Sequence, residues 1–408
     1  MTSPSTRGTS VAPGTGGLAA TAPGGVLPCT LRELLGYFVR LGSFGFGGPI
    51  ALAGHMQRDL VDERRWFSKQ DYAQGLALAQ LSPGPLAAQL AMYLGWVRAG
   101  GVGATLVAAA FIFPSFVMVL GLSVLYVHFG GLAWMQGAFY GIGAAVIAVI
   151  SRSAVKLVGQ TVAKDGLLWA ILAVNGLVTA WTEREIVWLF ALSGTVALLF
   201  KAPPRPSSRP AALALGVAPP WVFQGLAGVA SWPTLYRVAT YFGEAGVFVF
   251  GSGLAIVPFL RGGVVGQFHW LNDRQFLDAV AVAMITPGPV VITVAFIGYL
   301  VAGLGGALAA GLGVFLPCYL FVVLLAPHYR RYAENRSVKA FVNGVTAAAC
   351  GAISGAAFVL GRRAIVDVAT FVIFIVALAL LVVVKKLPEP VLILGAGAAG
   401  LMLRATGP

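Results

Sequence analysis

Two short motifs join a hydroxyl residue to a proline–glycine–proline turn, and each lies inside a long apolar run. The motifs, called here the PGP loops, are Ser82, Pro83, Gly84 and Pro85, and Thr286, Pro287, Gly288 and Pro289. A proline inside a helix removes a backbone donor and clashes with the preceding turn, at a cost of about 3 kcal/mol. Two prolines around a glycine therefore predict a broken helix at each loop.

The chemistry expected at such a break is anion binding. Ser82 or Thr286 is expected to cap the helix that follows, and proline suits a first helical position. The next backbone amides then lie without partners at the positive end of a helix, where a small anion fits. Transporters use broken helices in this way near the membrane midplane. Gln80 and Gln89 flank the first loop as donors, although helix packing is the commoner role for a membrane glutamine.

Composition places the chain in a membrane. It has 408 residues, of which 58% are hydrophobic and 10% charged, with a mean hydropathy of +0.87. A soluble domain has about 25% charged residues. The net charge is +13, and the charged residues lie between apolar runs, which indicates that they orient the protein by the positive-inside rule. Basic clusters interleaved with aromatic residues are absent, so the lipid bilayer is the expected partner and nucleic acid is excluded.

The sequence gives little support to an enzyme. Its 3 Cys and 4 His residues are scattered, and they match no metal-binding or nucleophile motif. We therefore predict no catalytic residues, no metal and no cofactor.

The chain divides into four segments. Residues 1–29 are predicted to be a disordered tail, 30–200 a first transmembrane repeat, 201–233 a Pro-rich linker and 234–408 a second repeat. An offset of 204 residues places Trp66 on Trp270 and one PGP loop on the other. The repeat is clear over about 60 residues. Beyond it Pro114 matches Pro317 one residue out of register.

Each copy contains five ordinary apolar spans and one run broken by a PGP loop. If the broken runs turn back within the membrane, most Lys and Arg residues fall on one side, as the positive-inside rule requires. If every run crosses, this bias disappears. The first arrangement is preferred, and an odd number of crossings inverts one copy relative to the other. The predicted fold class is an all-α polytopic membrane protein of two inverted-topology repeats, with about five crossings each plus one broken, re-entrant PGP helix per repeat.

Charges inside the first span of each copy form a second pattern. The offset aligns Glu33 with Arg237 and Arg40 with Glu244, so each span carries an acid and a base on one face, with the signs exchanged. One interpretation is a structural ion pair between Arg40 and Glu244. Another makes Arg40 an anion ligand and Glu244 a proton-linked carboxylate, because charges in a membrane usually face a cavity. A third places these side chains at the membrane interface.

A further glycine cluster follows Arg40. Gly47, Gly48 and Pro49 are expected to unwind or kink the first span and to contribute to the substrate site. The alternative is close helix packing, because small residues let membrane helices approach one another.

Residues 46–96, FGGPIALAGHMQRDLVDERRWFSKQDYAQGLALAQLSPGPLAAQLAMYLGW, resemble the chromate ion transporter family, and residues 250–303 resemble it a second time. Both halves are covered, as in the long two-domain form of the family. The family positions matched here are Gly47, Gly48, Pro49, Trp66, Gln80, Pro83, Gly84 and Pro85. The second copy departs from this pattern with Ser252, Gly253 and Met284, which suggests that the first copy makes more of the substrate contacts.

The resemblance implies a multi-pass protein of the bacterial inner membrane that exports the chromate dianion and gives chromate resistance. Sulfate and protons remain open as coupled ions, and a homodimer is compatible with the sequence. The alternatives are a carrier of sulfate or another small oxyanion, an amino-acid exporter of the lysine-exporter type, and, from another class, a membrane-embedded enzyme acting on lipid phosphates.

Overall fold

The computed structural model describes residues 26–46, 48–129, 133–162, 165–183, 186–202, 232–248, 256–328, 335–384 and 387–405. Throughout these residues the regular structure is helical, which confirms the all-α prediction. The predicted tail 1–29 falls almost wholly outside them, as does the predicted linker 201–233. The predicted segment boundaries therefore remain predictions.

The first half begins with a helical hairpin. α1 (Leu31–Phe44) starts with a capping box between Thr30 and Glu33, and α2 (Gly48–Met56) continues into a π-helical turn, η1 (Gln57–Glu63). The Tyr37 hydroxyl donates a hydrogen bond to Asp59 at 3.2 Å. Residues 22 positions apart would lie about 33 Å apart on a straight helix. The chain therefore reverses between α1 and α2, which differs from the single kinked span that the sequence predicts.

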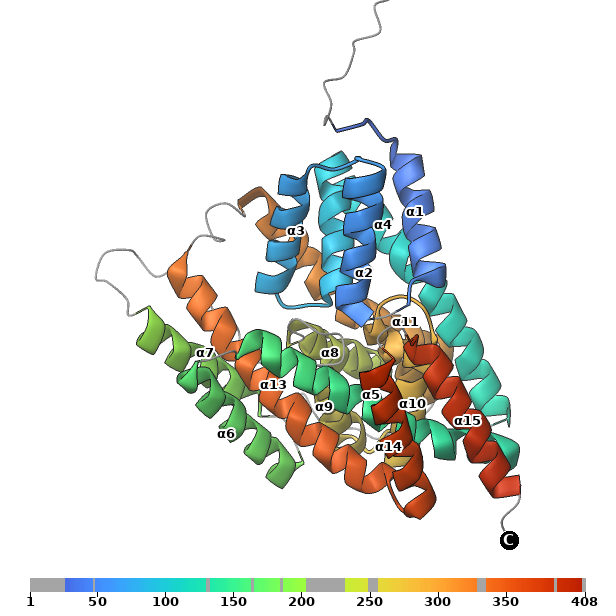
Figure 1. The fold of residues 1–408 in the computed structure, drawn as a ribbon. Helices are drawn as coiled ribbons and strands as arrows, with labels where there is room; N and C mark the ends of the chain where they lie inside the picture. The colour runs from blue at the N-terminus through green and yellow to red at the C-terminus, as the bar shows by residue number, and fades with distance from the viewer. Residues whose placement is uncertain are drawn as a thin grey trace, which may run out of the picture.

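A second hairpin has the first PGP loop at its tip. α3 (Lys69–Leu81) is capped by Ser68 and ends before the loop, and α4 (Leu86–Phe129) begins after it. Gly75 of α3 lies so close to Tyr93 of α4 that an added Cβ would collide with the ring. The two arms are thus antiparallel, and the predicted helix break is confirmed. Figure 1 shows α1, α2 and α3 grouped beside the first part of α4.

α4 is itself two helices. Ala99 and Gly100 have non-helical backbone angles, with a φ of +58° at Gly100. A Cβ on Gly95 would lie 2.5 Å from the carbonyl oxygen of Gly103, which is only possible if the chain folds back between them. Residues 101–129 then form one long helix.

The second half repeats this order. Its first hairpin pairs α8 (Trp232–Phe248) with α9 (Ile256–Arg261) and η4 (Gly262–Gln267), and Tyr241 donates to the carbonyl of Phe259 at 2.9 Å. The second PGP loop joins α10 (Asp273–Ile285) to η5 (Val290–Ile292), α11 (Thr293–Leu325) and η6 (Ala326–His328). α11 folds back at Ala302 and Gly303, as α4 does at Ala99 and Gly100.

The short 3₁₀ helix η5 explains the one-residue slip in the repeat. Residues 86–89 of the first half form α-helix, whereas Val290–Ile292 of the second half form 3₁₀-helix. Four α-helical residues rise about 6 Å, and three 3₁₀ residues rise the same distance. After this point the offset is 203 residues, which aligns Pro114 with Pro317.

The remaining helices pack across the two halves. α5 (Ala133–Thr161) packs against α14 (Val368–Val383) and α15 (Glu389–Ala405), and α13 (Arg336–Ala364) packs against α6 (Gly166–Thr182) and α7 (Val187–Lys201). This crosswise packing makes one body of the two copies (Figure 1).

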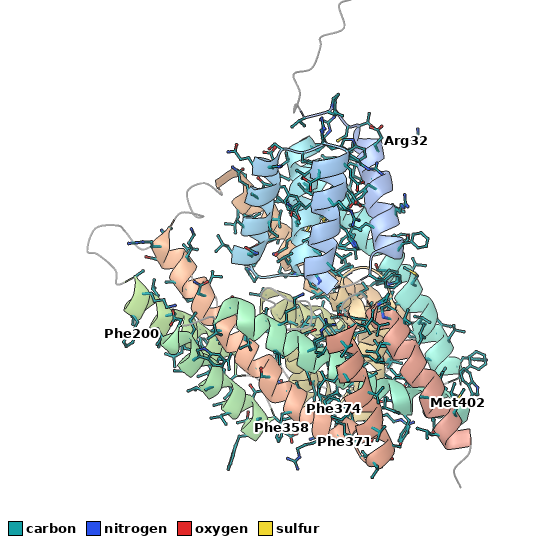
Figure 2. All side chains as sticks on the ribbon, viewed as in Figure 1. Arg32, Phe200, Phe358, Phe371, Phe374 and Met402 are labelled. Carbon is teal, nitrogen blue, oxygen red and sulfur yellow. The ribbon has the colours of Figure 1, made fainter. Side chains whose placement is uncertain are left out.

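The outer helix faces suit a bilayer. In the described part of the chain, four helices are long and apolar enough to cross a membrane: residues 86–129, 134–159, 290–325 and 336–364. Figure 2 shows outward-pointing apolar side chains, among them Phe200, Phe358, Phe371 and Met402, all of which are exposed. The multi-pass membrane class is therefore supported.

Candidate functional site

The two long helices of α4 and α11 cross at the centre of the molecule. Thr105 Oγ1 lies 2.7 Å from the Tyr319 hydroxyl, and a Cβ on Gly311 would lie 3.4 Å from the Phe116 ring. As the residue number rises on one helix it falls on the other. Repeat-equivalent helices therefore run antiparallel where they meet.

Both PGP loops lie at this crossing. Gly84 has a φ of +138° and Gly288 a φ of +98°, a region that L-residues with a Cβ rarely occupy. A Cβ on Gly84 would lie 2.9 Å from Cys318 Sγ, and a Cβ on Gly288 would collide with Ser115 Oγ. Ser115 and Cys318 are equivalent at the 203-residue offset, so each loop touches the same position of the opposite half.

The same pair ties the loops to the first hairpins. Ser115 Oγ donates to the carbonyl of Gly42 at 3.0 Å, and Cys318 Sγ lies 3.8 Å from the equivalent carbonyl of Gly246. The Gly288 amide also donates to the carbonyl of Gly45 at 2.9 Å. Hairpin tips from both halves thus meet around one point.

The hydroxyl residues of the loops do not cap the following helices. Ser82 and Thr286 instead end α3 and α10, and each donates back to its own helix, to Leu78 and Val282 respectively, at 2.7 Å. The capping prediction is wrong because the next helical residues are Leu86 and Val290, each directly after the second proline, so Ser82 and Thr286 lie too far back to reach their amides.

The first loop offers buried polar groups. The first residues of α4, Leu86, Ala87 and Ala88, are buried, and their amides precede that of Gln89, which makes the first intrahelical hydrogen bond, to the carbonyl of Pro85. Gln89 Nε2 donates to the carbonyl of Pro83 at 2.5 Å, while its Oε1 is buried and lacks a partner. In the second loop the only amide between the prolines, that of Gly288, is already bonded to Gly45. Among the described residues, the first loop therefore offers the buried Gln89 oxygen and the amides at the start of α4.

Several other predicted site residues are not buried. Arg40, Glu244 and Gln80 are exposed, and Arg237 is half-buried. Arg40 and Glu244 form no ion pair with each other, and Glu33 accepts hydrogen bonds from Thr30. Gly48 and Pro49 begin α2, whereas Gly47 is outside the described residues.

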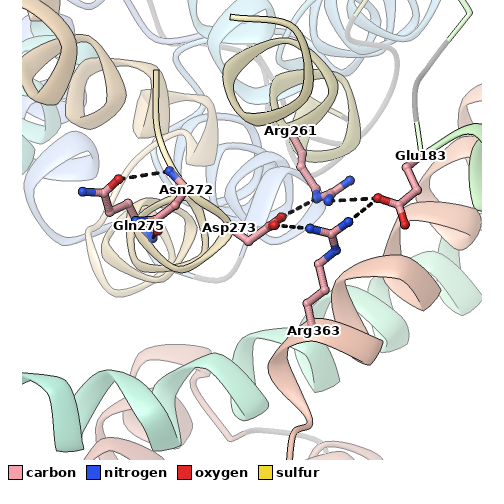
Figure 3. A network of polar contacts seen from close by, with 6 residues as sticks. All are labelled: Glu183, Arg261, Asn272, Asp273, Gln275 and Arg363. Carbon is pink, nitrogen blue, oxygen red and sulfur yellow. Dashed lines mark hydrogen bonds and ion pairs between the residues drawn. The ribbon is translucent and has the colours of Figure 1, made fainter. Parts of the chain in front are cut away.

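A four-residue ion-pair cluster, which the sequence does not predict, joins Glu183 of the first half to three residues of the second half (Figure 3). Arg261 contacts Asp273 at 2.8 Å and Glu183 at 3.3 Å, and Arg363 contacts both acids as well. Arg261 is 6% exposed. This ion-pair cluster joins the ends of α9, α10 and α13 to the turn after α6. Its members are up to 180 residues apart in sequence, so no local signal identifies it.

A further residue that the sequence does not single out is Asp278, which is buried in α10 and accepts a hydrogen bond from Tyr126 at 2.7 Å. Aligning α3 with α10 would have revealed it, because Asp278 takes the place of Gln74 in an otherwise apolar stretch.

Comparison with known proteins is consistent with this architecture. The chromate transporter family profile matches residues 32–199 and again 236–401. A chromate transport protein of Cupriavidus metallidurans is 56% identical, with 91% of this chain and 93% of the relative covered. A probable chromate transport protein of Synechococcus elongatus is 52% identical, with 91% and 95% covered, and a chromate transport protein of Pseudomonas aeruginosa is 34% identical, with 91% and 92% covered.

No solved protein structure is significantly similar to the chain. The family profile nevertheless spans both halves, and it matches each of the two hairpin pairs whose tips meet at the centre. This chain belongs to the chromate transporter family.

Proposed function

We propose that this protein exports chromate across the bacterial inner membrane by alternating access and thereby gives chromate resistance. The observation that carries the proposal is the meeting of two PGP loops, one from each half, at the crossing of α4 and α11. Family membership supports chromate as the substrate. The helix arrangement supports a site where backbone groups, rather than a fixed metal or nucleophile, contact that substrate.

The first PGP loop is the proposed binding site. Chromate is a tetrahedral dianion, and the amides at Leu86, Ala87 and Ala88 would donate to its oxygens at the positive end of a helix. A site built from amides holds a dianion without a full countercharge, which favours release. An inside-negative potential of 100 mV would contribute about 4.6 kcal/mol to export of two negative charges.

The two copies are proposed to be inverted-topology repeats that exchange conformations during transport. Support comes from the antiparallel course of equivalent helices, traced by the contacts Thr105–Tyr319 and Phe116–Gly311. In this arrangement one copy would open the crossing to one side of the membrane, and the equivalent copy would open it to the other side.

The proposal is tested by uptake of labelled chromate into inside-out vesicles, with sulfate as competitor. The informative variant is Gly84→Ala, in which a Cβ would lie 2.9 Å from Cys318 at a φ of +138°. The matched control is Gly54→Ala on α2, where a Cβ meets nothing within 4 Å. Arg40→Gln tests the predicted anion ligand in the same assay.

We expect the control to transport normally and Gly84→Ala to lose at least roughly tenfold in rate, because one misplaced group in a positioned site has that effect. Normal transport by Gly84→Ala, with the protein inserted, would remove the first loop from the site. Flux of sulfate but not chromate would overturn the substrate. Absence of flux for every oxyanion would favour the alternative of a membrane-embedded enzyme.

A further inference from the structure

Asp278 is a buried carboxylate in the middle of an apolar helix. It is 5% exposed, and the residues around it from Phe276 to Met284 are all buried. An ionised carboxylate in such surroundings loses its hydration and tends to be neutralised by a proton. Among the described residues, its hydrogen-bond partner is the Tyr126 hydroxyl, at 2.7 Å.

This hydrogen bond joins the two halves, because Tyr126 belongs to α4 and Asp278 to the helix that leads to the second PGP loop. The Tyr126 ring packs edge-on against Phe139 and Phe296, at 5.6 and 5.2 Å between centroids. An apolar cavity of about 360 Å³ runs beside α10 from Tyr126 to Ile285, the residue before Thr286. The carboxylate therefore lies at a contact between the two halves, on the helix that leads to the second PGP loop.

The repeat supplies an internal control for this position. At the offset of 204 residues Asp278 corresponds to Gln74, which accepts a longer contact of 3.4 Å from Tyr93. A neutral amide thus occupies this place in the first half, where the helix is less buried. The acid in the second half can also gain and lose a proton, which the hairpin fold does not require.

None of the other charged side chains described around α10 forms an ion pair with Asp278. Arg274, on the same helix, acts on it from a distance and donates to the carbonyl of Gln136 at 3.4 Å. Arg261 of α9 is occupied in the ion-pair cluster. Arg152 and Lys156 of α5 lie near Glu389 of α15, toward the other end of α5. His128 of α4 is exposed, and α11, η4 and η5 contain no charged residue.

We propose that Asp278 is the proton-binding residue of transport, with Tyr126 as its positioning residue. This inference rests on the proposed function and adds the ion that accompanies the substrate. The proton comes from water on the side where the α10 hairpin opens, and it binds a carboxylate oxygen to give a neutral carboxylic acid. The Tyr126 hydroxyl can donate or accept, so it stays hydrogen-bonded to Asp278 in both states. Chromate moving one way is thus coupled to a proton moving the other way.

The test uses the full chain in vesicles of phosphatidylethanolamine and phosphatidylglycerol. Two fluxes are compared: exchange of labelled for unlabelled chromate without a gradient, and net chromate accumulation driven by a pH gradient. Exchange reports the chromate site, whereas accumulation reports proton coupling. Asp278→Asn removes the titratable group and keeps its size. Gln74→Leu is the matched control at the equivalent position.

We expect Asp278→Asn to keep exchange within about threefold and to lose pH-driven accumulation, while Gln74→Leu keeps both. Tyr126→Phe should retain exchange but shift the pH at which accumulation is half-maximal. Proton release from the purified protein on addition of chromate, followed with a pH indicator, should disappear in Asp278→Asn.

Accumulation or proton release that persists in Asp278→Asn would overturn the inference. If Asp278→Asn does not fold, Tyr126→Phe with an unchanged pH profile would also overturn it. Absence of chromate exchange in the unmodified protein would instead overturn the proposed function, so the two failures are distinguishable.

Discussion

The helices that precede the two PGP loops share a motif, a length and a register, yet they lie in different environments. Every residue from Phe276 to Met284 of α10 is buried. In the equivalent stretch of α3, residues 72–80, only Tyr72, Gly75, Leu78 and Ala79 are buried. The same hairpin is therefore covered in one half and uncovered in the other.

Packing and charge explain the difference. α10 is covered by α5 and α15, and its N-terminus is held by the ion-pair cluster through Asp273. At the equivalent positions of the first half, Gln57 replaces Arg261 and Lys69 replaces Asp273, so no such cluster can form. Both halves contain the hairpin, and the side chains around it determine whether it is covered. In alternating access, the covered hairpin would become uncovered while the uncovered hairpin of the other half becomes covered.

The comparison is tested most directly by thiol labelling at one equivalent pair. Gln80 is exposed and Met284 is 5% exposed, and the three native cysteines are buried. We expect Gln80→Cys to react with a membrane-impermeant maleimide at least roughly tenfold faster than Met284→Cys, because the latter must wait for a local opening. Equal rates in intact vesicles of both orientations would contradict the asymmetry.

The second way to break the comparison is to give the second half the side chains of the first. Arg261→Gln combined with Asp273→Lys should break the ion-pair cluster and destabilise the protein by about 3 kcal/mol, because Arg363 would then face a lysine in place of its partner Asp273. Urea denaturation in detergent would measure this.

The matched control is Arg58→Gln, since Arg58 pairs with Asp59 and Glu63 while its side chain is 59% exposed. Its effect should stay below about 1 kcal/mol. In the double variant Met284→Cys should also label faster. A double variant as stable as the parent, with unchanged labelling, would show that the cluster does not keep α10 closed.

The smallest effect concerns the loop that begins α6. Asp165 caps this helix by accepting from the amides of Leu167 and Leu168, and it pairs with Lys201. The hydrogen bond from Lys201, followed by those amides, lowers the pKa of Asp165. A lowered pKa in the folded state means that the ionised pair stabilises at neutral pH and that this contribution is lost as the pH falls through that pKa.

Asp165→Ala should therefore cost about 1 kcal/mol at neutral pH, as loss of a cap does. Asp165→Asn should cost less, because asparagine retains the cap, and its difference from the parent should vanish in acid. Thermal unfolding at two pH values would measure both variants. Equal destabilisation by Asn at neutral and acidic pH would contradict the role of the pair.

Local chemistry made the helix breaks predictable. Two prolines around a glycine break a helix in any context, and the 204-residue repeat identified the second break from the first. Whether the Gly-Gly-Pro cluster kinks or reverses the chain depends on distant contacts, such as the hydrogen bond from Tyr72 to the carbonyl of Ala53 at 2.6 Å. The sequence contains no local record of that contact.

The charges were harder to interpret. Spacing shows that Glu33 and Arg40 share a helix face, but it does not say whether that face is inside or outside, and the structure leaves Arg40 exposed. Asp278 and Arg261 gain their environments from helices far along the chain. A repeat alignment can flag such positions, whereas only packing shows which of them are buried.

The 3₁₀ turn at Val290–Ile292 has a consequence for how the two halves are recognised as relatives. A residue is missing there, yet tighter winding restores the lost length before Gly298 meets Gly306 as Gly95 meets Gly103. The two halves therefore agree in the length of this segment along the helix axis and differ in its number of residues. A sequence alignment that penalises a gap at this point therefore underestimates the similarity of the two halves, whereas a comparison of their helix lengths detects it.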